Sequence, residues 1–273
     1  MSLDIAAYLA RIAYGGPTHP TLDVLRALHA RHPAMIPFES VDPFLGTRIQ
    51  IDIDSIQQKL VRQRRGGYCQ EHNLLFHDVL ACLGFSVTAL GGRVVWMSPG
   101  RDAPLTHRLT LIDLPEGRFI ADVGFGAQSG PAPLRLETDE TQVTSHGAYR
   151  IAKHGEVYEL QLHVEGQWQP MYRFRLDAVS RADFEMANWY TCSYPYGRFT
   201  RNLVVARILE TSSVGLVNKT FTIRHPDGTQ QHRPLTGAQD LADVLGVTMA
   251  IDLPVSATAL WERLPDQLVT SRP

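Results

Sequence analysis

The chain has 273 residues, and 26 Lys and Arg against 28 Asp and Glu leave a formal net charge of −2 at pH 7. Hydrophobic residues make up 44% and charged residues 20%, which is the composition of a folded globular protein and excludes a largely disordered chain. With so little net charge, neither a nucleic-acid partner nor a membrane partner is expected.

The N-terminus and the cysteines are typical of a protein in a reducing compartment. The first 17 residues lack the basic stretch and apolar run of a signal peptide, and no apolar run approaches the roughly 20 residues of a spanning helix. Cys69, Cys82 and Cys192 form no CxxC pair and are too few for a disulfide framework. We therefore expect a cytoplasmic protein with free thiols, with Cys82 on the apolar side of its helix.

Helical periodicity dominates the first 85 residues. Apolar side chains recur at helical spacing in four segments, with Thr21 as a candidate N-cap and Gly84 as a helix stop. The predicted helices span residues 4–13, 21–29, 54–61 and 69–83.

Beyond residue 85 the sequence becomes rich in short β-type segments separated by turn residues. These segments, which predict an antiparallel sheet or barrel, are residues 85–97, 107–114, 118–125 and 148–176. An alternating segment from 216 to 224, a hairpin turn at 225–228 and helices at 240–245 and 256–264 predict a small α/β unit at the end. Because helices and strands are segregated along the chain, the predicted fold class is α+β.

Residues 64–73, which read RRGGYCQEHN, predict a nucleophile. Two glycines permit a tight turn directly before Cys69, and Cys69 opens a predicted helix. The unpaired N–H groups and the positive dipole end of a helix N-terminus favour the thiolate, which is the nucleophilic form of cysteine. A buried structural cysteine after a tight turn is the alternative.

A histidine and an aspartate are candidates for the base and its orienting group. His107 opens one predicted strand, Asp122 lies among apolar residues in the next, and residues 115–117 form the turn between them. In such a hairpin the two residues come nearly opposite each other across strands about 4.8 Å apart, so their side chains can meet. A solvated aspartate at the strand end is the alternative.

Other polar motifs carry weaker predictions. His29 and His32 could form a two-ligand metal pair, but an exposed helix end is the preferred interpretation. Residues 124–130 form a glycine-rich loop that fits no Walker motif, so it indicates only close approach of the backbone to a ligand. Glu39 is predicted to pair with Arg65 and brace the turn under Cys69, the alternative being two solvated residues.

Five segments together resemble the signature segments of the arylamine N-acetyltransferases. They are residues 21–46, RRGGYCQEHN at 64–73, THRLTL at 106–111, ADVGFG at 121–126 and ANWYTCSYPYGRF at 187–199. The resemblance implies a helical domain at 1–86, an antiparallel β-barrel domain at 87–204 and an α/β lid at 205–273. It also implies a catalytic triad like that of cysteine proteases, which maps onto Cys69, His107 and Asp122.

The resemblance implies transfer of an acetyl group from acetyl-CoA to the nitrogen of arylamines or arylhydrazines, without a metal. The mechanism is ping-pong, through an acetyl-cysteine. Positions that line the family's acceptor pocket match Phe38, Val94, Phe125 and Phe199. Positions that approach coenzyme A match Thr106, Gly124 and Gly126.

One residue departs from the family pattern beside the nucleophile: Gln70 stands where bacterial members usually have Phe. The departure leaves the shape of the pocket open. Alternative functions are an amide synthase or a thioester hydrolase that uses the same triad, and a binding protein that has lost activity.

Overall fold

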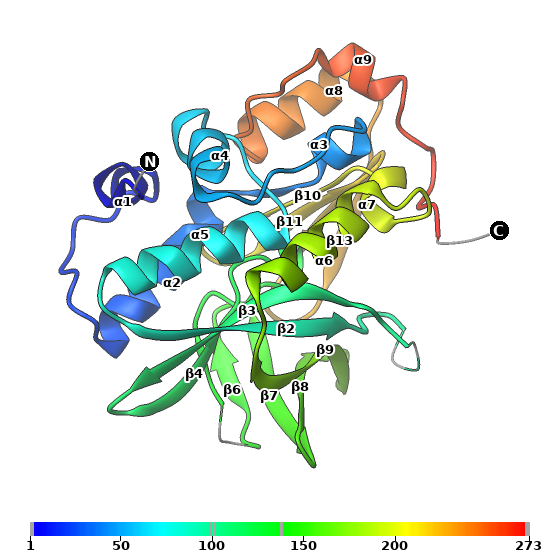
Figure 1. The fold of residues 1–273 in the computed structure, drawn as a ribbon. Coiled ribbons are helices and arrows are strands. Elements are labelled where there is room, and N and C mark those ends of the chain that lie inside the picture. The colour runs from blue at the N-terminus through cyan, green and yellow to red at the C-terminus, as the bar shows by residue number, and fades with distance from the viewer. Residues whose placement is uncertain (1–2, 99, 101, 137–138, 271–273) are drawn as a thin grey trace.

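The computed structural model of the protein describes residues 3–98, 100, 102–136 and 139–270. Its helices are α1 (Ile5–Arg11), α2 (Leu22–Met35), α3 (Val41–Phe44), α4 (Ile53–Ile56), α5 (Cys69–Cys82), α6 (Arg181–Ser193), α7 (Arg198–Arg201), α8 (Ala238–Asp243) and α9 (Ala257–Trp261). A π-helical turn, Gln57–Arg62, extends α4, and another, Val244–Thr248, extends α8. Figure 1 shows α2 and α5 lying between the large sheet and the C-terminal helices.

The N-terminal helices begin where side chains satisfy their first N–H groups. Asp4 accepts from the N–H of Ala7 at the start of α1, and Thr21 accepts from the N–H of Val24 at the start of α2. Helix α2 continues well past the predicted end at residue 29, because its later turns are buried against the core rather than frayed in solvent. Gly84 follows α5 with φ +87°, in the left-handed region that glycine adopts without strain.

Within the described ranges, one sheet has eight antiparallel strands in the order β5-β4-β3-β2-β9-β8-β7-β6. Its strands are β2 (Ser86–Val94), β3 (Leu105–Leu114), β4 (Gly117–Ala121), β5 (Leu134–Arg135), β6 (Gln142–Thr144), β7 (Gly147–His154), β8 (Val157–Val164) and β9 (Gln167–Ala178). The side chain of Gln142 hydrogen-bonds both the N–H (2.8 Å) and the carbonyl (3.0 Å) of Arg135, so the two edge strands meet. The sheet is therefore a nearly closed barrel, as predicted for this region.

A second, five-stranded sheet in the order β1-β10-β11-β12-β13 pairs one strand from the N-terminal part of the chain with four strands that follow the barrel. Its strands are β1 (Phe38–Glu39), β10 (Val204–Ile208), β11 (Ser213–Val217), β12 (Thr220–Arg224) and β13 (Gln230–Pro234). Strand β1 pairs with β10 on one side, and on the other its Glu39 N–H donates to the carbonyl of Gly67 at 2.8 Å. The loop before Cys69 is thereby attached to this sheet. The division into three domains at 86/87 and 204/205 stays a prediction.

Buried apolar side chains of the described residues form three clusters, one among the helices, one inside the barrel and one between the second sheet and α8–α9. The helical cluster includes Cys69 itself, so the predicted nucleophile lies at the border of a packed core. In the part of the chain that the structure describes, no helix has both the length and the apolar character needed to cross a bilayer.

Buried charges brace the turn that precedes Cys69. Arg65 Nη2 lies 2.6 Å from Glu39 Oε1, so the predicted pair is present, and 2.9 Å from Asp42 Oδ1. Lys59 Nζ lies 2.7 Å from Asp42 and 2.9 Å from Glu71. Because Glu39 is fully buried, this network compensates a charge that would otherwise be costly inside the protein.

Arg65→Met is expected to lower the free energy of unfolding by about 3 kcal/mol, because it removes the nearest positive charge from the buried Glu39 carboxylate and leaves it the N–H of Val41 and the more distant Lys59. Urea unfolding measures this. Arg175→Met is the matched control, since it breaks an exposed ion pair with Glu156 and should leave the unfolding midpoint unchanged. Equal midpoints for the two variants would show that Arg65 braces nothing.

Candidate active site

Cys69 is the first residue of α5, and the loop before it requires glycine. An ideal Cβ on Gly66 would lie 2.1 Å from the carbonyl oxygen of Pro37, so no larger residue fits there. The Glu71 side chain accepts from the N–H of Tyr68 at 3.0 Å and fixes the start of the helix. Cys69 is 7% exposed and is free, with its thiol at the end of the helix where unpaired N–H groups gather.

The prediction for Cys82 is wrong, because this residue is exposed. It is the last residue of α5, and the chain turns away at Gly84 before another element can cover it. Cys192, by contrast, is buried in α6.

His107 and Asp122 are in direct contact. His107 lies in β3, paired with Gly92 of β2, and its Nε2 is 2.6 Å from Oδ2 of Asp122. Both side chains are buried. The contact expected from the hairpin is thus present, but Asp122 is not within a strand as expected, because β4 ends one residue earlier, at Ala121.

The carboxamide of Asn73 explains why β4 ends there. The register of β3 and β4, with Thr110 opposite Ala121, would bring Arg108 opposite Val123. Instead, Asn73 Nδ2 donates to the Arg108 carbonyl at 2.6 Å, and Asn73 Oδ1 accepts from the Val123 N–H at 3.0 Å. The inserted side chain keeps the two strands apart just beyond their last pair.

Asn73 also holds the carboxylate, and the sequence analysis missed it. Its Nδ2 donates to Asp122 Oδ1 at 2.8 Å, and the N–H of Gly124 donates to the same oxygen at 3.0 Å. Asn73 lies four residues after Cys69, so both residues occupy one face of α5. That spacing was the signal that could have found it.

The contact leaves both members of the pair charged. Burial lowers the pKa of His107, but the Asp122 carboxylate, together with a hydrogen bond that the imidazolium donates to Cys69, outweighs this and raises that pKa to about 10. Burial raises the pKa of Asp122, but His107, Asn73 and the Gly124 N–H outweigh it, so that pKa is lowered. An imidazolium beside a thiol at neutral pH is the electrostatic arrangement that favours a thiolate.

Aromatic rings hold the imidazole in place on the barrel side. The Tyr172 ring centroid lies 5.0 Å from that of His107, and the Phe125 ring meets it edge-on at 5.3 Å. Val94, at the end of β2, is opposite Tyr172 in β9. Tyr172 is a second residue that the sequence analysis missed, because only the β2–β9 pairing brings it to the site.

The other two predicted pocket residues lie on the helical side. The rings of Phe38 and Phe199 are 5.8 Å apart, and Phe199 meets Tyr68, the residue before Cys69, edge-on at 5.9 Å. Phe38 comes from β1 and Phe199 from α7. The structure thus gathers aromatic side chains from distant segments on both sides of the Cys69 and His107 region.

The glycines after Asp122 allow this loop to approach the helix. An ideal Cβ on Gly124 would lie 3.0 Å from the Cα of Cys69 and 2.9 Å from Asn73 Nδ2. Gly126 has φ +74°, a conformation that side chains disfavour. Thr106, the third residue predicted to approach coenzyme A, precedes His107 and accepts a hydrogen bond on its carbonyl from the Gln70 side chain at 2.7 Å.

A chain of buried hydrogen bonds runs behind α5. Tyr8 Oη lies 2.8 Å from His32 Nδ1, His32 Nε2 lies 2.9 Å from His72 Nδ1, and His72 Nε2 lies 3.1 Å from the Pro37 carbonyl. Burial lowers the pKa of both histidines, so each ring is neutral and carries one proton. Because a carbonyl can only accept, the proton of His72 is on Nε2, which makes His32 Nε2 and the Tyr8 hydroxyl donors.

The preferred interpretation of His29 and His32 as an exposed helix end is therefore wrong. Both are almost completely buried, since α2 packs against the core, and His29 Nε2 accepts from the N–H of Asp122 at 3.2 Å. Across the described ranges, no group of three or more His, Cys, Asp or Glu side chains could hold a metal ion.

The pKa shifts of the buried histidines predict that the protein loses stability both toward acid and toward alkaline pH. Burial lowers the pKa of His72 and of His29 to about 4, so the unfolded chain binds protons that the folded chain does not between pH 6.5 and 4. Their contribution to the free energy of unfolding is complete above pH 6.5. It is lost as the pH falls toward 4, by about 1–3 kcal/mol per histidine. His107, with its raised pKa, contributes fully below pH 6.5 and loses its contribution as the pH rises toward 10.

We therefore expect the unfolding free energy, measured in urea, to be greatest near pH 6.5. His72→Gln keeps a donor and an acceptor but does not titrate, so it should flatten the acid limb and leave the alkaline limb unchanged. An acid limb with the wild-type slope in this variant would contradict the assignment.

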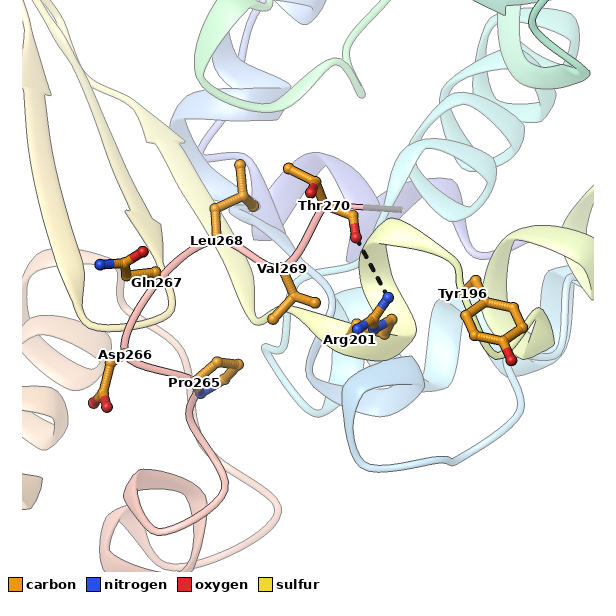
Figure 2. Close-up of a pocket in the computed structure, with 8 residues that line it drawn as sticks. All are labelled: Tyr196, Arg201, Pro265, Asp266, Gln267, Leu268, Val269 and Thr270. Atoms are coloured by element: carbon orange, nitrogen blue, oxygen red, sulfur yellow. Dashed lines mark hydrogen bonds between the residues drawn. The ribbon is translucent and has the colours of Figure 1, made fainter. Parts of the chain in front are cut away.

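A wide surface cavity of about 720 Å³ lies elsewhere, beside α7 and the C-terminal segment (Figure 2). Its lining residues are Tyr196, Arg201, Pro265, Asp266, Gln267, Leu268, Val269 and Thr270. Arg201 donates to the carbonyl of Thr270 at 3.3 Å, and Asp266 pairs with Lys219 at 2.6 Å. The lining includes none of the predicted site residues, so the chemistry of this protein is not placed there.

Comparisons with known proteins identify the family of this chain. A family described as N-acetyltransferase matches residues 21–258. The arylamine N-acetyltransferase of Mycolicibacterium smegmatis is 39% identical over 259 residues, covering 93% of this chain and 94% of the relative. That of Escherichia coli (strain K12) is 44% identical over 216 residues, covering 79% and 77%.

Solved structures give the same result at the level of the fold. The Mycobacterium marinum arylamine N-acetyltransferase, solved in complex with CoA, superimposes with a TM-score of 0.91 at 34% identity and covers 96% of this chain and 99% of its own. The enzyme from Salmonella typhimurium gives a TM-score of 0.89 at 35% identity, covering 96% and 99%. From the sequence match, the shared fold and the cysteine at the helix start, this chain belongs to the arylamine N-acetyltransferase family.

Proposed function

We propose that this enzyme transfers the acetyl group of acetyl-CoA to the nitrogen of an arylamine or arylhydrazine, by a ping-pong mechanism through an acetyl-Cys69 intermediate. The observation that carries the proposal is the buried His107–Asp122 contact at 2.6 Å, which keeps a positive charge beside the thiol of Cys69. The names of the relatives, and CoA in the M. marinum structure, support the two substrates.

In the first half-reaction, the Cys69 thiolate attacks the carbonyl carbon of the acetyl thioester. The new bond joins Cys69 Sγ to the acetyl carbon, the bond from that carbon to the CoA sulfur breaks, and the imidazolium of His107 gives its proton to the leaving thiolate. Free N–H groups in the first turn of α5 stabilise the oxyanion that forms between these events. Exchange of one thioester for another makes this step nearly balanced in energy.

In the second half-reaction, His107 is neutral and serves as the base. The arylamine nitrogen, which is uncharged at pH 7, attacks the acetyl carbon, His107 accepts its proton, and Cys69 leaves as the thiolate. Asp122 fixes the imidazole tautomer and stabilises the imidazolium that is regenerated. Each turnover returns the pair to its starting charge.

The binding residues follow from the two sides of the site. We assign the aromatic acceptor to Phe38, Phe125, Phe199 and Val94, since flat apolar rings pack favourably on aromatic side chains. We assign the approach of coenzyme A to Thr106, Gly124 and Gly126, of which Thr106 and Gly126 are half-buried, while Gly124 brings this loop against the start of α5.

Intact-protein mass spectrometry after mixing with acetyl-CoA tests this function. We expect a mass gain of one acetyl group, located on Cys69, that persists until an arylamine is added and then disappears. Cys69→Ala should show no gain, whereas Cys82→Ala, the control, should behave as the wild type. Loss of the acetyl group in buffer without amine would indicate a thioester hydrolase, and no gain at all would rule out the acyl-enzyme.

A further inference from the structure

Gln70, the residue that departs from the family pattern, makes one specific contact. It follows Cys69 in α5, its side chain is fully buried, and its Nε2 donates to the carbonyl of Thr106 at 2.7 Å. Thr106 in turn directly precedes His107. A single hydrogen bond therefore joins the residue after the nucleophile to the residue before the base.

Asn73 makes the same kind of contact one helical turn later. Its Nδ2 donates to the carbonyl of Arg108, the residue after His107, at 2.6 Å. Residues three apart lie on the same face of a helix, so Gln70 and Asn73 present two carboxamides side by side to β3. Together they hold the backbone on both sides of His107.

In the described segments, the backbone of β3 around His107 has no neighbouring strand on one edge, so its polar groups there need other hydrogen-bond partners. Residue His107 pairs with Gly92 of β2 on one edge, but β4 ends at Ala121 and covers the other edge only from Thr110 onward. The register with β2 shifts between Gly92 and Arg93, beside Thr106, and the carbonyls of Thr106 and Arg108 both accept from side chains of α5. The two carboxamides of α5 supply the missing donors.

We propose that Gln70 is a positioning residue that sets the separation of Cys69 and His107 by tying the start of β3 to the start of α5. The proposal rests on the proposed roles of these two residues. With Asn73 alone, the edge of β3 that faces away from β2 would be held only after His107, and the backbone at Thr106 could shift on that edge. Loss of the second attachment would displace the imidazole from the thiol without removing any reacting group.

The other polar atom of the Gln70 side chain, Oε1, allows the proposal to be tested by a substitution that keeps the size of the side chain. Among the residues that the structure describes, its Oε1 has no hydrogen-bond partner. Gln70→Met therefore preserves the volume and strands no protein donor, and only the carbonyl of Thr106, in a half-buried residue, loses its partner. The cost to folding is expected to be small, which separates a positioning role from a structural one.

The matched control is Gln57→Met. Gln57 is equally buried, and its Oε1 accepts from the N–H of Asp4 at 2.6 Å, so this variant also loses one glutamine–backbone hydrogen bond, but beside α1. We expect Gln70→Met to slow acetylation of Cys69 in a single turnover roughly ten- to hundred-fold and to change its pH profile. Gln57→Met should acetylate at the wild-type rate with the wild-type profile.

Alkylation of Cys69 by iodoacetamide provides a second readout that needs no substrate. If the wild type does not react with acetyl-CoA but Gln70→Met still slows alkylation, the proposed function fails and the positioning role stands. If the wild type is acetylated and Gln70→Met matches it in both rates and in both pH profiles, the positioning role is overturned. Unfolding of Gln70→Met but not of Gln57→Met would also overturn it, since it would assign Gln70 to the stability of the fold.

Gln70→Glu is expected to restore the hydrogen bond to Thr106 in a pH-dependent way. A protonated carboxyl group can donate to the Thr106 carbonyl, whereas a carboxylate cannot. Relative to the wild type at each pH, Gln70→Glu should therefore react with iodoacetamide at a near-normal rate in mild acid and progressively more slowly as the pH rises. A constant ratio across the pH range would count against the hydrogen bond to Thr106 as the cause.

Discussion

The buried contact between His107 and Asp122 constrains the rest of the site. Two opposite charges inside a protein are tolerated only where the geometry is good and the remaining hydrogen-bonding atoms are satisfied. Here Asn73 and the N–H of Gly124 occupy the second oxygen of Asp122. Because the Asn73 side chain has to reach that oxygen, it enters between β3 and β4 and forces the strands apart. The gap between β3 and β4 and the full set of hydrogen bonds on Asp122 thus have the same cause, which is the Asn73 side chain.

The Asp122 carboxylate also explains why the pKa of one buried histidine shifts in the opposite direction from the pKa of three others. His29, His32 and His72 lie in the interior, and burial lowers the pKa of each. The ring of His107 is just as buried, but Asp122 at 2.6 Å reverses the direction of its shift. His32 and His72 form fixed hydrogen bonds behind α5, and His29 accepts from the N–H of Asp122, whereas the charged His107 lies beside the thiol.

Much of the site could be predicted because its chemistry follows local patterns. The glycine pair before Cys69 predicts a helix start, and α5 begins at that residue. The hairpin around residue 116 brings the start of β3 close to the end of β4, so His107 and Asp122 come near each other although Asp122 lies just beyond β4. The early end of β4 and the burial of His29 could not be predicted, because both depend on helices that pack against the sheet from elsewhere in the sequence. The spacing of Asn73 from Cys69 places it on the same helix face, but its partners could not be predicted, since they lie 35 and 49 positions away.

The central claim is that Cys69 is activated by the buried pair, and the relative alkylation of two cysteines tests it most directly. Exposure alone predicts that the exposed Cys82 reacts with iodoacetamide before the buried Cys69. The account predicts the reverse near neutral pH, measured by peptide mass mapping of one sample, and predicts that Asp122→Asn abolishes the advantage of Cys69. Faster labelling of Cys82 in the wild type, or an advantage that survives in Asp122→Asn, would contradict it.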